Sequence, residues 1–417
     1  MMTMSRSPTT FSNATPLAGP TGRGPGSAPY ETLREAARDL VPALLERAGR
    51  GEDLRRLPPE TLADMHKSGL FRFMQPARLG GGELDYVALI DLPAEVARAD
   101  ASVGWNLGNL GSHHYMLAMF PKAAQDLVWN ENLDALIASS FVFPAGRAVK
   151  VEGGYTLNGR WPFSSGVDAC DWNMVGAMVA PQTPGSEPEM RVFLIHKKDY
   201  KNYDNWDPLG LRGTGSHDVE SKDLFVPDHM TLALANIMGG PTPGAEQNPG
   251  SLYKIPVFAL FAFVLSGTAL GNARGALDDY VAAMKTRASR YSGAKIGELQ
   301  SVQIAIASAA AKIDAAERIM RGCCIEGMED AIAGRIPDMQ RKVTYRRDGA
   351  FSVQLCTEAV DELFKLSGAT GLVKGGAMER RFRDAHAIAS HIAFSFDAAG
   401  GNFGKVTLGF TSDNKTL

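Results

Sequence analysis

Residues 161–166 of this 417-residue chain, Trp-Pro-Phe-Ser-Ser-Gly, combine two aromatic rings with two hydroxyls and a flexible glycine. Aromatic rings can hold a flat heterocycle, while hydroxyls and backbone amides bind its polar edge. The same residue types also occur in loops whose aromatic side chains are simply buried. Just upstream, polar and apolar residues alternate, and Asn158-Gly159 is typical of a tight turn. We therefore expect a β-hairpin that turns at Asn158-Gly159 and leads into a small polar loop.

A second group of candidate residues lies on a stretch rich in small residues. Trp105, His113 and His114 could contact a bound ring through their aromatic or imidazole groups. Ordinary core packing is an equally good interpretation of Trp105. Because neighbouring residues on a helix do not share a face, we expect His113 and His114 to point to different surroundings.

The composition is that of a multidomain enzyme subunit. A chain of 417 residues exceeds the usual size of a single core. The net charge of −3, with both signs interspersed, argues against nucleic acid or an anionic membrane as a partner. Four cysteines without disulfide or zinc spacing favour a cytoplasmic location, and no metal site is expected. The glycines of residues 210–215 have the wrong order for a dinucleotide fingerprint, so no NAD(P)H site is recognisable.

The residue pattern divides the chain into four parts and predicts an α+β multidomain fold. The first part is rich in Ser, Thr, Pro and Gly, the second and fourth show helical periodicity, and the third alternates with a period of two. We expect a disordered tail over 1–29, an α-helical domain over 30–134, a central β-barrel or sandwich over 135–245 and a four-helix bundle over 246–417.

Several segments, in this order and spacing, resemble the acyl-CoA dehydrogenase superfamily. Residues 157–168 (LNGRWPFSSGVD) are similar to its flavin-contacting β segment, and residues 207–228 and 267–280 are similar to two later segments. The FSSG version is closer to the oxygenase components of two-component flavin monooxygenases, relatives of p-hydroxyphenylacetate hydroxylase. The resemblance covers roughly residues 30–410 and implies an acyl-CoA-dehydrogenase-like fold.

The resemblance also implies roles for individual residues. Flavin contacts are implied for Trp105, Ser139, Ser140, Phe163, Ser164 and Ser165, with Ser165 beside flavin N5. Substrate contacts are implied for His113, Phe258, Phe261 and His391. Arg287 and Arg290 lie where the superfamily presents an arginine to the flavin phosphate, sometimes across a subunit boundary, although solvent exposure is the commoner fate of an arginine.

A dehydrogenase of this superfamily needs a carboxylate base, and its two known positions carry none here. One position holds Ile392, and residues 256–271, which contain the other, have no acidic residue. Beside Ile392 lies His391, and relatives among the hydroxylases are similar here. Imidazole is a suitable base for a phenol with a pKa of about 10, since a phenolate is the better nucleophile. A buried histidine without catalytic duty remains the alternative for His391.

These inferences lead to one main hypothesis. By resemblance, the chain would be the oxygenase component that takes reduced FMN, or FADH2, from a separate NAD(P)H-dependent flavin reductase. With O2 it would hydroxylate a small phenolic or indolic molecule through a flavin C4a-hydroperoxide, with His391, Ser165 and His113 as catalytic residues and a homotetramer as the assembly. Because residues 251–273 carry only the cation Lys254, we expect a neutral or apolar aromatic substrate. The alternatives are an N- or S-oxygenase, an acyl-CoA dehydrogenase or a non-catalytic flavin-binding protein.

Overall fold

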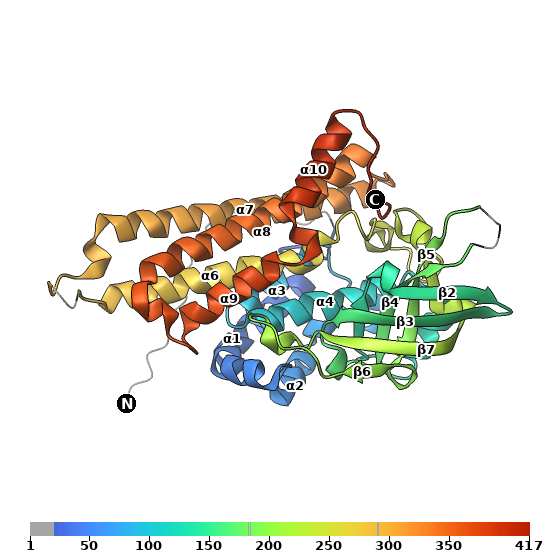
Figure 1. Cartoon of the computed structure of the whole chain (residues 1–417), viewed down its shortest axis with the longest axis horizontal. Coiled ribbons are helices and arrows are strands. Elements are labelled where there is room, and N and C mark those ends of the chain that lie inside the picture. The colour runs from blue at the N-terminus through green and yellow to red at the C-terminus, as the bar shows by residue number, and fades with distance from the viewer. Residues whose placement is uncertain (1–20, 182, 184, 290–291) are drawn as a thin grey trace.

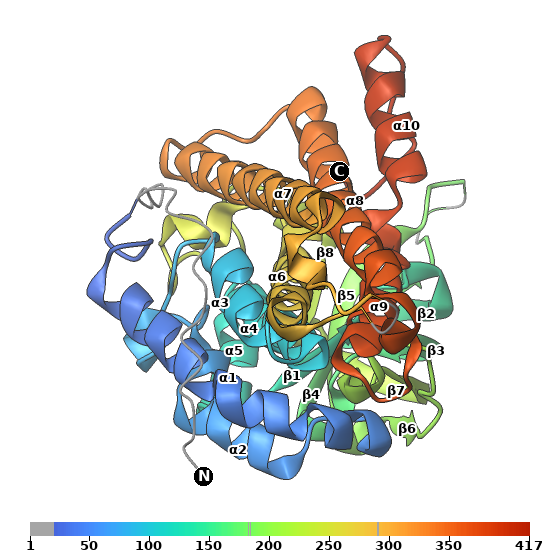
Figure 2. The same ribbon diagram turned by 90° about the vertical axis from the view of Figure 1, so that its left-hand side faces the viewer.

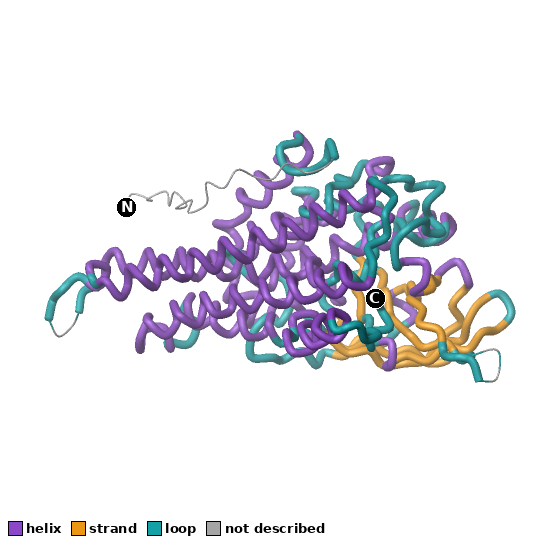
Figure 3. Tube along the Cα trace, turned by 90° about the horizontal axis from the view of Figure 1, so that it is seen from above, coloured by secondary structure: helices purple, strands orange, loops and turns teal. Residues whose placement is uncertain are grey.

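The computed structural model describes residues 21–181, 183, 185–289 and 292–417 (Figure 1). Helices at the beginning of the chain pack beside a sheet, and a long helix bundle extends away from both. In Figure 3 the strands gather at one end of the molecule and the helices occupy the rest. The first helices are α1 (Ala28–Leu54), α2 (Pro59–Lys67), α3 (Ala88–Ala97), α4 (Ala101–Leu117) and α5 (Lys122–Trp129).

Helix α4 lies at the centre of the molecule, and all its residues except Asn109 are buried. Its start is capped by Asp100, whose side chain accepts a hydrogen bond from the Ser102 amide. Small residues allow the close packing around it, because a Cβ at Gly108 would lie 2.4 Å from the backbone oxygen of Val264. The helix that carries Trp105 and His113 is therefore held between α3 and the bundle.

The central β domain that the sequence predicts is confirmed, and its strands lie in one mixed sheet rather than in two stacked sheets. The strand order is β6-β7-β3-β2-β4-β5-β8, and β1 pairs in parallel with β4. The strands are β1 (Ile137–Ser140), β2 (Gly146–Val151), β3 (Gly154–Ser164), β4 (Trp172–Val179), β5 (Glu189–His196), β6 (Lys201–Tyr203), β7 (His217–Pro227) and β8 (Thr231–Ala233).

The expected turn at Asn158-Gly159 is wrong. The β2–β3 hairpin turns at Glu152-Gly153, where Gly153 has a φ of +74°, and Asn158-Gly159 lies inside β3. There the pairing with β7 shifts by a bulge, and Asn158 Oδ1 accepts a hydrogen bond from the Asp223 amide. At this bulge the positive φ belongs to Asp223 on β7, and Gly159 is required by space, because a Cβ there would lie 2.6 Å from the Trp161 ring.

The C-terminal four-helix bundle is confirmed. It consists of α6 (Ala262–Thr286), α7 (Gln300–Ile332), α8 (Met339–Ser367) and α9 (Ala377–Ala389), and α10 (Phe396–Thr407) packs against α8. Helix α6 contacts α3 and α4 as well as the other bundle helices, so its start faces the residues of α4. In Figure 2, α10 points upward at the edge of the molecule. Among the described residues, no helix is long and apolar enough to cross a membrane.

The structure describes part of the predicted tail and the regions around both predicted domain boundaries. Of the tail predicted over 1–29, residues 1–20 lie outside the described residues. The expectation does not hold for 21–29, because Thr21 binds Asp85, Arg23 donates to the Gly82 carbonyl and α1 begins at Ala28. The boundaries predicted near residues 134 and 245 fall in the connections that precede β1 and α6.

Candidate active site

Three distant parts of the chain meet in an aromatic cluster. The ring of His391, which follows α9, lies 5.5 Å from the ring of Trp105 on α4 and 6.1 Å from that of Phe261, measured between centroids. Phe258 lies 5.7 Å from Phe261, and Phe394 lies 5.7 Å from His391. We call these five residues the aromatic cluster. It unites four of the residues that the family resemblance singled out.

His113 reaches this cluster only through another ring. Its centroid lies 6.0 Å from that of Phe141, which in turn lies 5.7 Å from Phe258. The ring nitrogen Nδ1 donates to the Ile137 carbonyl at 2.7 Å, so Nε2 keeps its lone pair. Burial lowers the pKa of His113 to about 4, which leaves the imidazole neutral. His114 points elsewhere, as expected, and stacks on Trp129.

A chain of hydroxyls begins at the indole of Trp105. Its Nε1–H donates to Ser165 Oγ at 3.0 Å, and Ser165 Oγ lies 2.8 Å from Ser216 Oγ. Ser216 Oγ lies 2.7 Å from Thr214 Oγ1, which donates to the Leu211 carbonyl at 2.9 Å. Because each hydroxyl has one hydrogen, this end point orients the whole chain: Ser165 donates to Ser216, and Ser216 donates to Thr214.

The orientation of this hydroxyl chain leaves Ser165 Oγ with one free lone pair. Its hydrogen is committed to Ser216, and its other lone pair accepts the Trp105 N–H. Ser165 can therefore accept a further hydrogen bond from an N–H donor but cannot donate one without breaking the chain. The neighbouring Ser164 is fully buried and accepts from Asn173 Nδ2 at 2.8 Å, so it faces into the sheet. Of the two serines, Ser165 is the one directed toward Trp105.

Phe163 presents an exposed aromatic face beside these hydroxyls. Its side chain is 64% exposed although its φ is +64°, a region that non-glycine residues rarely adopt. The ring lies edge-to-face with Trp206 at 6.3 Å. On β1, Ser139 and Ser140 are buried, and Ser140 Oγ donates to the Pro162 carbonyl at 2.6 Å, which holds this segment against β1. An exposed ring beside a hydroxyl acceptor fits the flat ring system of a flavin.

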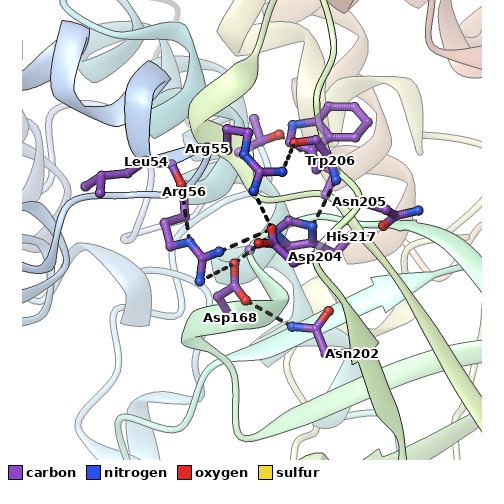
Figure 4. A network of polar contacts seen from close by, with 12 residues as sticks. Leu54, Arg55, Arg56, Asp168, Asn202, Asp204, Asn205, Trp206 and His217 are labelled. Carbon is purple, nitrogen blue, oxygen red and sulfur yellow. Dashed lines mark hydrogen bonds and ion pairs between the residues drawn. The ribbon is translucent and has the colours of Figure 1, made fainter.

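A network of hydrogen bonds and ion pairs around His217 and Asp168 holds the segment that contains Ser216 in place (Figure 4). His217 Nδ1 accepts the Trp206 amide hydrogen at 3.1 Å, so its Nε2 carries the ring hydrogen and faces the Asp168 carboxylate at 3.1 Å. Arg56 lies 3.4 Å from the same carboxylate. Burial raises the pKa of Asp168, but His217 and Arg56 outweigh burial and lower it. The network ties the end of α1 to the strand that begins next to Ser216.

On the opposite side, the imidazole of His391 is neutral and has a defined tautomer. Its Nδ1 accepts the Ala393 amide hydrogen at 3.2 Å, so the ring hydrogen resides on Nε2. Burial, reinforced by the nearby charge of Arg346, lowers the pKa of His391 to about 4. The ring can donate a hydrogen bond from Nε2 as it stands. To accept a proton at Nε2 it must take the other tautomer and give up the Ala393 hydrogen bond.

The comparisons with known proteins agree with this geometry. Family models for the acyl-CoA dehydrogenase N-terminal domain and C-terminal domain match residues 27–131 and 263–396. The chain belongs to the acyl-CoA dehydrogenase family. It is 36% identical to the flavin-dependent monooxygenase oxygenase subunit HsaA of Rhodococcus jostii (strain RHA1), over 85% of this chain and 92% of that protein.

Two further comparisons cover nearly the whole length of the matched proteins. The FADH(2)-dependent resorcinol hydroxylase oxygenase component of Rhizobium sp. (strain MTP-10005) is 34% identical, over 86% of this chain and 89% of that protein. The crystal structure of 3-HSA hydroxylase from Rhodococcus sp. RHA1 has a TM-score of 0.88 at 34% identity and covers 93% of this chain and 99% of that one. The chain is thus similar to oxygenase components within the acyl-CoA dehydrogenase family.

Within the family, the position of the dehydrogenase base carries no carboxylate here. Ile392 occupies it and is 73% exposed. Asp384, on α9, is buried and accepts the Leu211 amide hydrogen at 2.7 Å, so its role is structural. Burial raises its pKa to about 7.

Of the two arginines suggested for the flavin phosphate, Arg287 is not brought to this site within one chain. Arg290 lies outside the described residues. Arg287 follows α6 and donates to the Ser367 carbonyl at 2.8 Å. Helix α6 has 25 residues, and at 1.5 Å per residue this corresponds to about 37 Å, so Arg287 lies far from the aromatic cluster at the start of the helix. It could reach such a site only in another copy of the chain.

Sequence reasoning missed four residues of the site: Thr214, Ser216, Phe141 and Arg346. The two hydroxyls lie in residues 207–228, whose resemblance to a family segment was recognised without assigning them a contact. Small polar side chains directly after Gly213 and Gly215 were the available signal. Arg346 is one of two adjacent arginines on a long helix, a pattern that usually indicates a solvated face, so its position near His391 had no signal in the sequence.

Proposed function

We propose that this protein is the oxygenase component of a two-component flavin-dependent monooxygenase that hydroxylates a small aromatic molecule. The observation that carries the proposal is the site itself: Trp105 and Ser165 offer a hydrogen-bonded flavin position, and His391 lies 5.5 Å from Trp105. The position of the dehydrogenase base holds an isoleucine, which disfavours proton abstraction from an acyl-CoA. The names of the relatives with 34–36% identity support the same reading.

Reduced flavin, when bound, supplies the electrons that activate O2. The residues that would hold its ring are Trp105, Phe163 and Ser165, with the free lone pair of Ser165 accepting the N5 hydrogen. Both FMN and FADH2 are compatible with these contacts, and the resorcinol hydroxylase relative is FADH2-dependent by name. A separate flavin reductase would supply the reduced flavin.

His391 would act on the substrate rather than on the flavin. From the neutral imidazole, Nε2–H can donate to the hydroxyl oxygen of a phenol, and the other tautomer can take its proton. A pKa of about 4 keeps the imidazole uncharged at neutral pH, but it also makes the ring a weaker base than the ordinary imidazole expected from the sequence. The Phe258 and Phe261 rings would pack against the ring of the substrate.

The assembly is part of the proposal. Helix α10 has no buried residue, and the exposed apolar side chains of Phe396, Leu408 and Phe410 lie on it or just after it. Apolar surface of this kind is typical of an interface. We propose a homotetramer in which such faces are covered, and a cytoplasmic location in keeping with four free, buried cysteines.

The test is turnover with and without a source of reduced flavin. The purified chain is mixed with a panel of phenols and indoles, O2 and either reduced FMN or FADH2, and products are followed by mass spectrometry. We expect a product one oxygen atom heavier than its substrate. The chain with NADH and oxidised flavin alone should be inactive, and adding a flavin reductase should restore turnover. NADH oxidation by the isolated chain above background would contradict the two-component assignment.

A further inference from the structure

Arg346 is a largely buried cation that lies next to the aromatic cluster. It sits on α8, and its Nη1 donates to the backbone carbonyl of Phe258 at 3.3 Å. Arg346 and Ile392, the sequence neighbour of His391, line the same cleft, and the charge of Arg346 contributes to the lowered pKa of His391. The residue therefore contacts one wall of the proposed substrate position and carries its charge near the group proposed to act on it.

No carboxylate of the described residues lies within 4.0 Å of the Arg346 guanidinium, although the residue is only partly exposed. Two more deeply buried arginines of this chain are paired: Arg321 with Asp91 and Arg381 with Asp279. Removing a cation from water without a counter-charge is costly, and burial lowers the pKa of Arg346 to about 10. A single bond to a neutral carbonyl satisfies one of the five N–H groups of a guanidinium.

The same guanidinium lines a cleft that opens to the surface. The cleft has a volume of about 510 Å³ and is bounded by Arg346, by Ile392 and by residues of α10. The other charged groups of the lining, Lys405 and Asp413, are paired with each other at 2.6 Å. Arg346 is thus the unpaired charge of the described lining, which also includes Ile392, the sequence neighbour of His391.

We propose that Arg346 is a specificity-determining residue that binds an anionic oxygen of the substrate, either a carboxylate or the phenolate itself. The inference rests on the proposed function for the identity of the substrate as an aromatic molecule. An anion at this position would supply the counter-charge that the chain lacks, and the planar guanidinium fork suits an oxyanion. The expectation of a neutral substrate considered only residues 251–273, whereas Arg346 comes from a different helix.

The experiment measures binding, so that it does not depend on turnover. Under anaerobic conditions, the complex with reduced FMN is titrated calorimetrically with 4-hydroxyphenylacetate and with 4-hydroxyphenylacetamide, which has nearly the same shape but no charge. A second arm titrates 4-nitrophenol across pH and reads its ionisation from its colour. Preference for the carboxylate identifies a carboxylate site, and a lowered pKa of bound nitrophenol identifies a phenolate site.

Substitutions separate charge from structure. Arg346→Gln can keep the hydrogen bond to the Phe258 carbonyl without the charge, and Arg346→Lys keeps the charge without the fork. We expect Arg346→Gln to weaken binding of the anionic probe about 10- to 100-fold, the range for a charge-assisted hydrogen bond, and to leave the amide within about twofold. Arg346→Lys should retain part of the preference. Arg341→Gln, on the same helix and paired with Glu326, is the matched control and should change neither affinity.

Each binding result either supports or overturns the proposed role of Arg346. Equal affinity for both probes in the unsubstituted protein, together with an unshifted nitrophenol pKa, would overturn the proposal. So would an Arg346→Gln variant that keeps the anion preference, because the residue would then serve only to hold Phe258. A protein that prefers the anion but oxygenates no phenol would instead reject the proposed function and leave the role of Arg346 standing.

Discussion

The two faces of the site differ in how completely their polar groups are satisfied. On the sheet face, Ser165, Ser216 and Thr214 form an oriented chain that ends at a backbone carbonyl and carries no charge. On the helix face, His391 and Arg346 are titratable, largely removed from water and unpaired with any carboxylate of the described residues. A satisfied, uncharged network can hold a cofactor in one position. Groups whose pKa values are shifted and whose charge is unpaired are suited to act on a substrate. The comparison predicts that substitutions on the sheet face affect how oxygen is used, and those on the helix face affect whether the substrate reacts.

The strongest test of this division is His391→Ala. If His391 holds or removes the phenolic hydrogen, hydroxylation should slow by roughly 10²- to 10⁴-fold, the usual contribution of a general base. Oxygen consumption by the reduced-flavin complex should continue, because that step does not involve the substrate hydroxyl. The measurement is product and hydrogen peroxide formed per reduced flavin in a single turnover, across pH 6 to 10. The loss should shrink as pH approaches the pKa of the phenol.

A matched control for this variant is His386→Ala. His386 lies on α9, five positions before His391, and is paired with Asp361 near the surface. Its removal should leave the product yield unchanged. Equal loss in both variants, or loss of oxygen consumption together with hydroxylation in His391→Ala, would assign His391 a structural role.

A smaller effect, and one of a different kind, is expected from Ser165→Ala on the sheet face. The variant loses the acceptor for the flavin N5 hydrogen and leaves the Trp105 N–H without its partner. Losing one such buried hydrogen bond costs on the order of 1 kcal/mol or more. We expect more hydrogen peroxide per reduced flavin, by roughly fivefold or more, with the fold intact. Peroxide and product are quantified in the same reaction. If Ser164→Ala releases the peroxide instead, the serine facing the flavin has been assigned one residue too late.

Trp105→Phe probes the start of the hydroxyl chain with less disturbance. The variant keeps an aromatic ring beside His391 but removes the indole N–H that donates to Ser165. Ser165 still donates to Ser216, so the chain keeps its direction, and peroxide release should rise by less than in Ser165→Ala. Thermal unfolding of both variants serves as the control for packing. A hydroxylation defect as large as that of His391→Ala would show that Trp105 belongs to the substrate face.

The two faces also differ in how far the sequence alone could predict them. Local motifs pointed to the sheet face: Ser165 and Phe163 were singled out because the FSSG segment is continuous in sequence. His391 was singled out because a family position next to it carries no carboxylate. Ser216 and Arg346 were not assigned, because their roles depend on contacts with Ser165 and Phe258, which are 51 and 88 positions away in sequence, and neither periodicity nor spacing reports such contacts. The prediction of a turn at Asn158-Gly159 failed because the pair lies at a bulge inside β3, where close packing against Trp161 requires the glycine.

The smallest expected effect on turnover comes from substituting Asp384, which lies between the two faces of the site. Asp384 accepts the Leu211 amide hydrogen, and the Leu211 carbonyl ends the hydroxyl chain. Burial raises the pKa of Asp384 to about 7, so the folded chain holds this proton more tightly than the unfolded chain, in which the pKa is about 4. The free energy of unfolding should therefore fall as pH rises from about 4 to about 7, because the folded carboxylate must ionise in a dry site.

Asp384→Asn keeps an acceptor for Leu211 and removes the ionisation. Its midpoint of thermal unfolding should therefore exceed that of the unsubstituted protein at pH 8 and differ little from it at pH 4. Turnover should change by less than about twofold, since the acceptor that holds the hydroxyl chain is retained. If the variant is less stable than the unsubstituted protein at pH 8, the ionised Asp384 carboxylate stabilises the fold through its charged neighbours. The two faces of the site would then be coupled by charge rather than by the hydrogen bond from Leu211 alone.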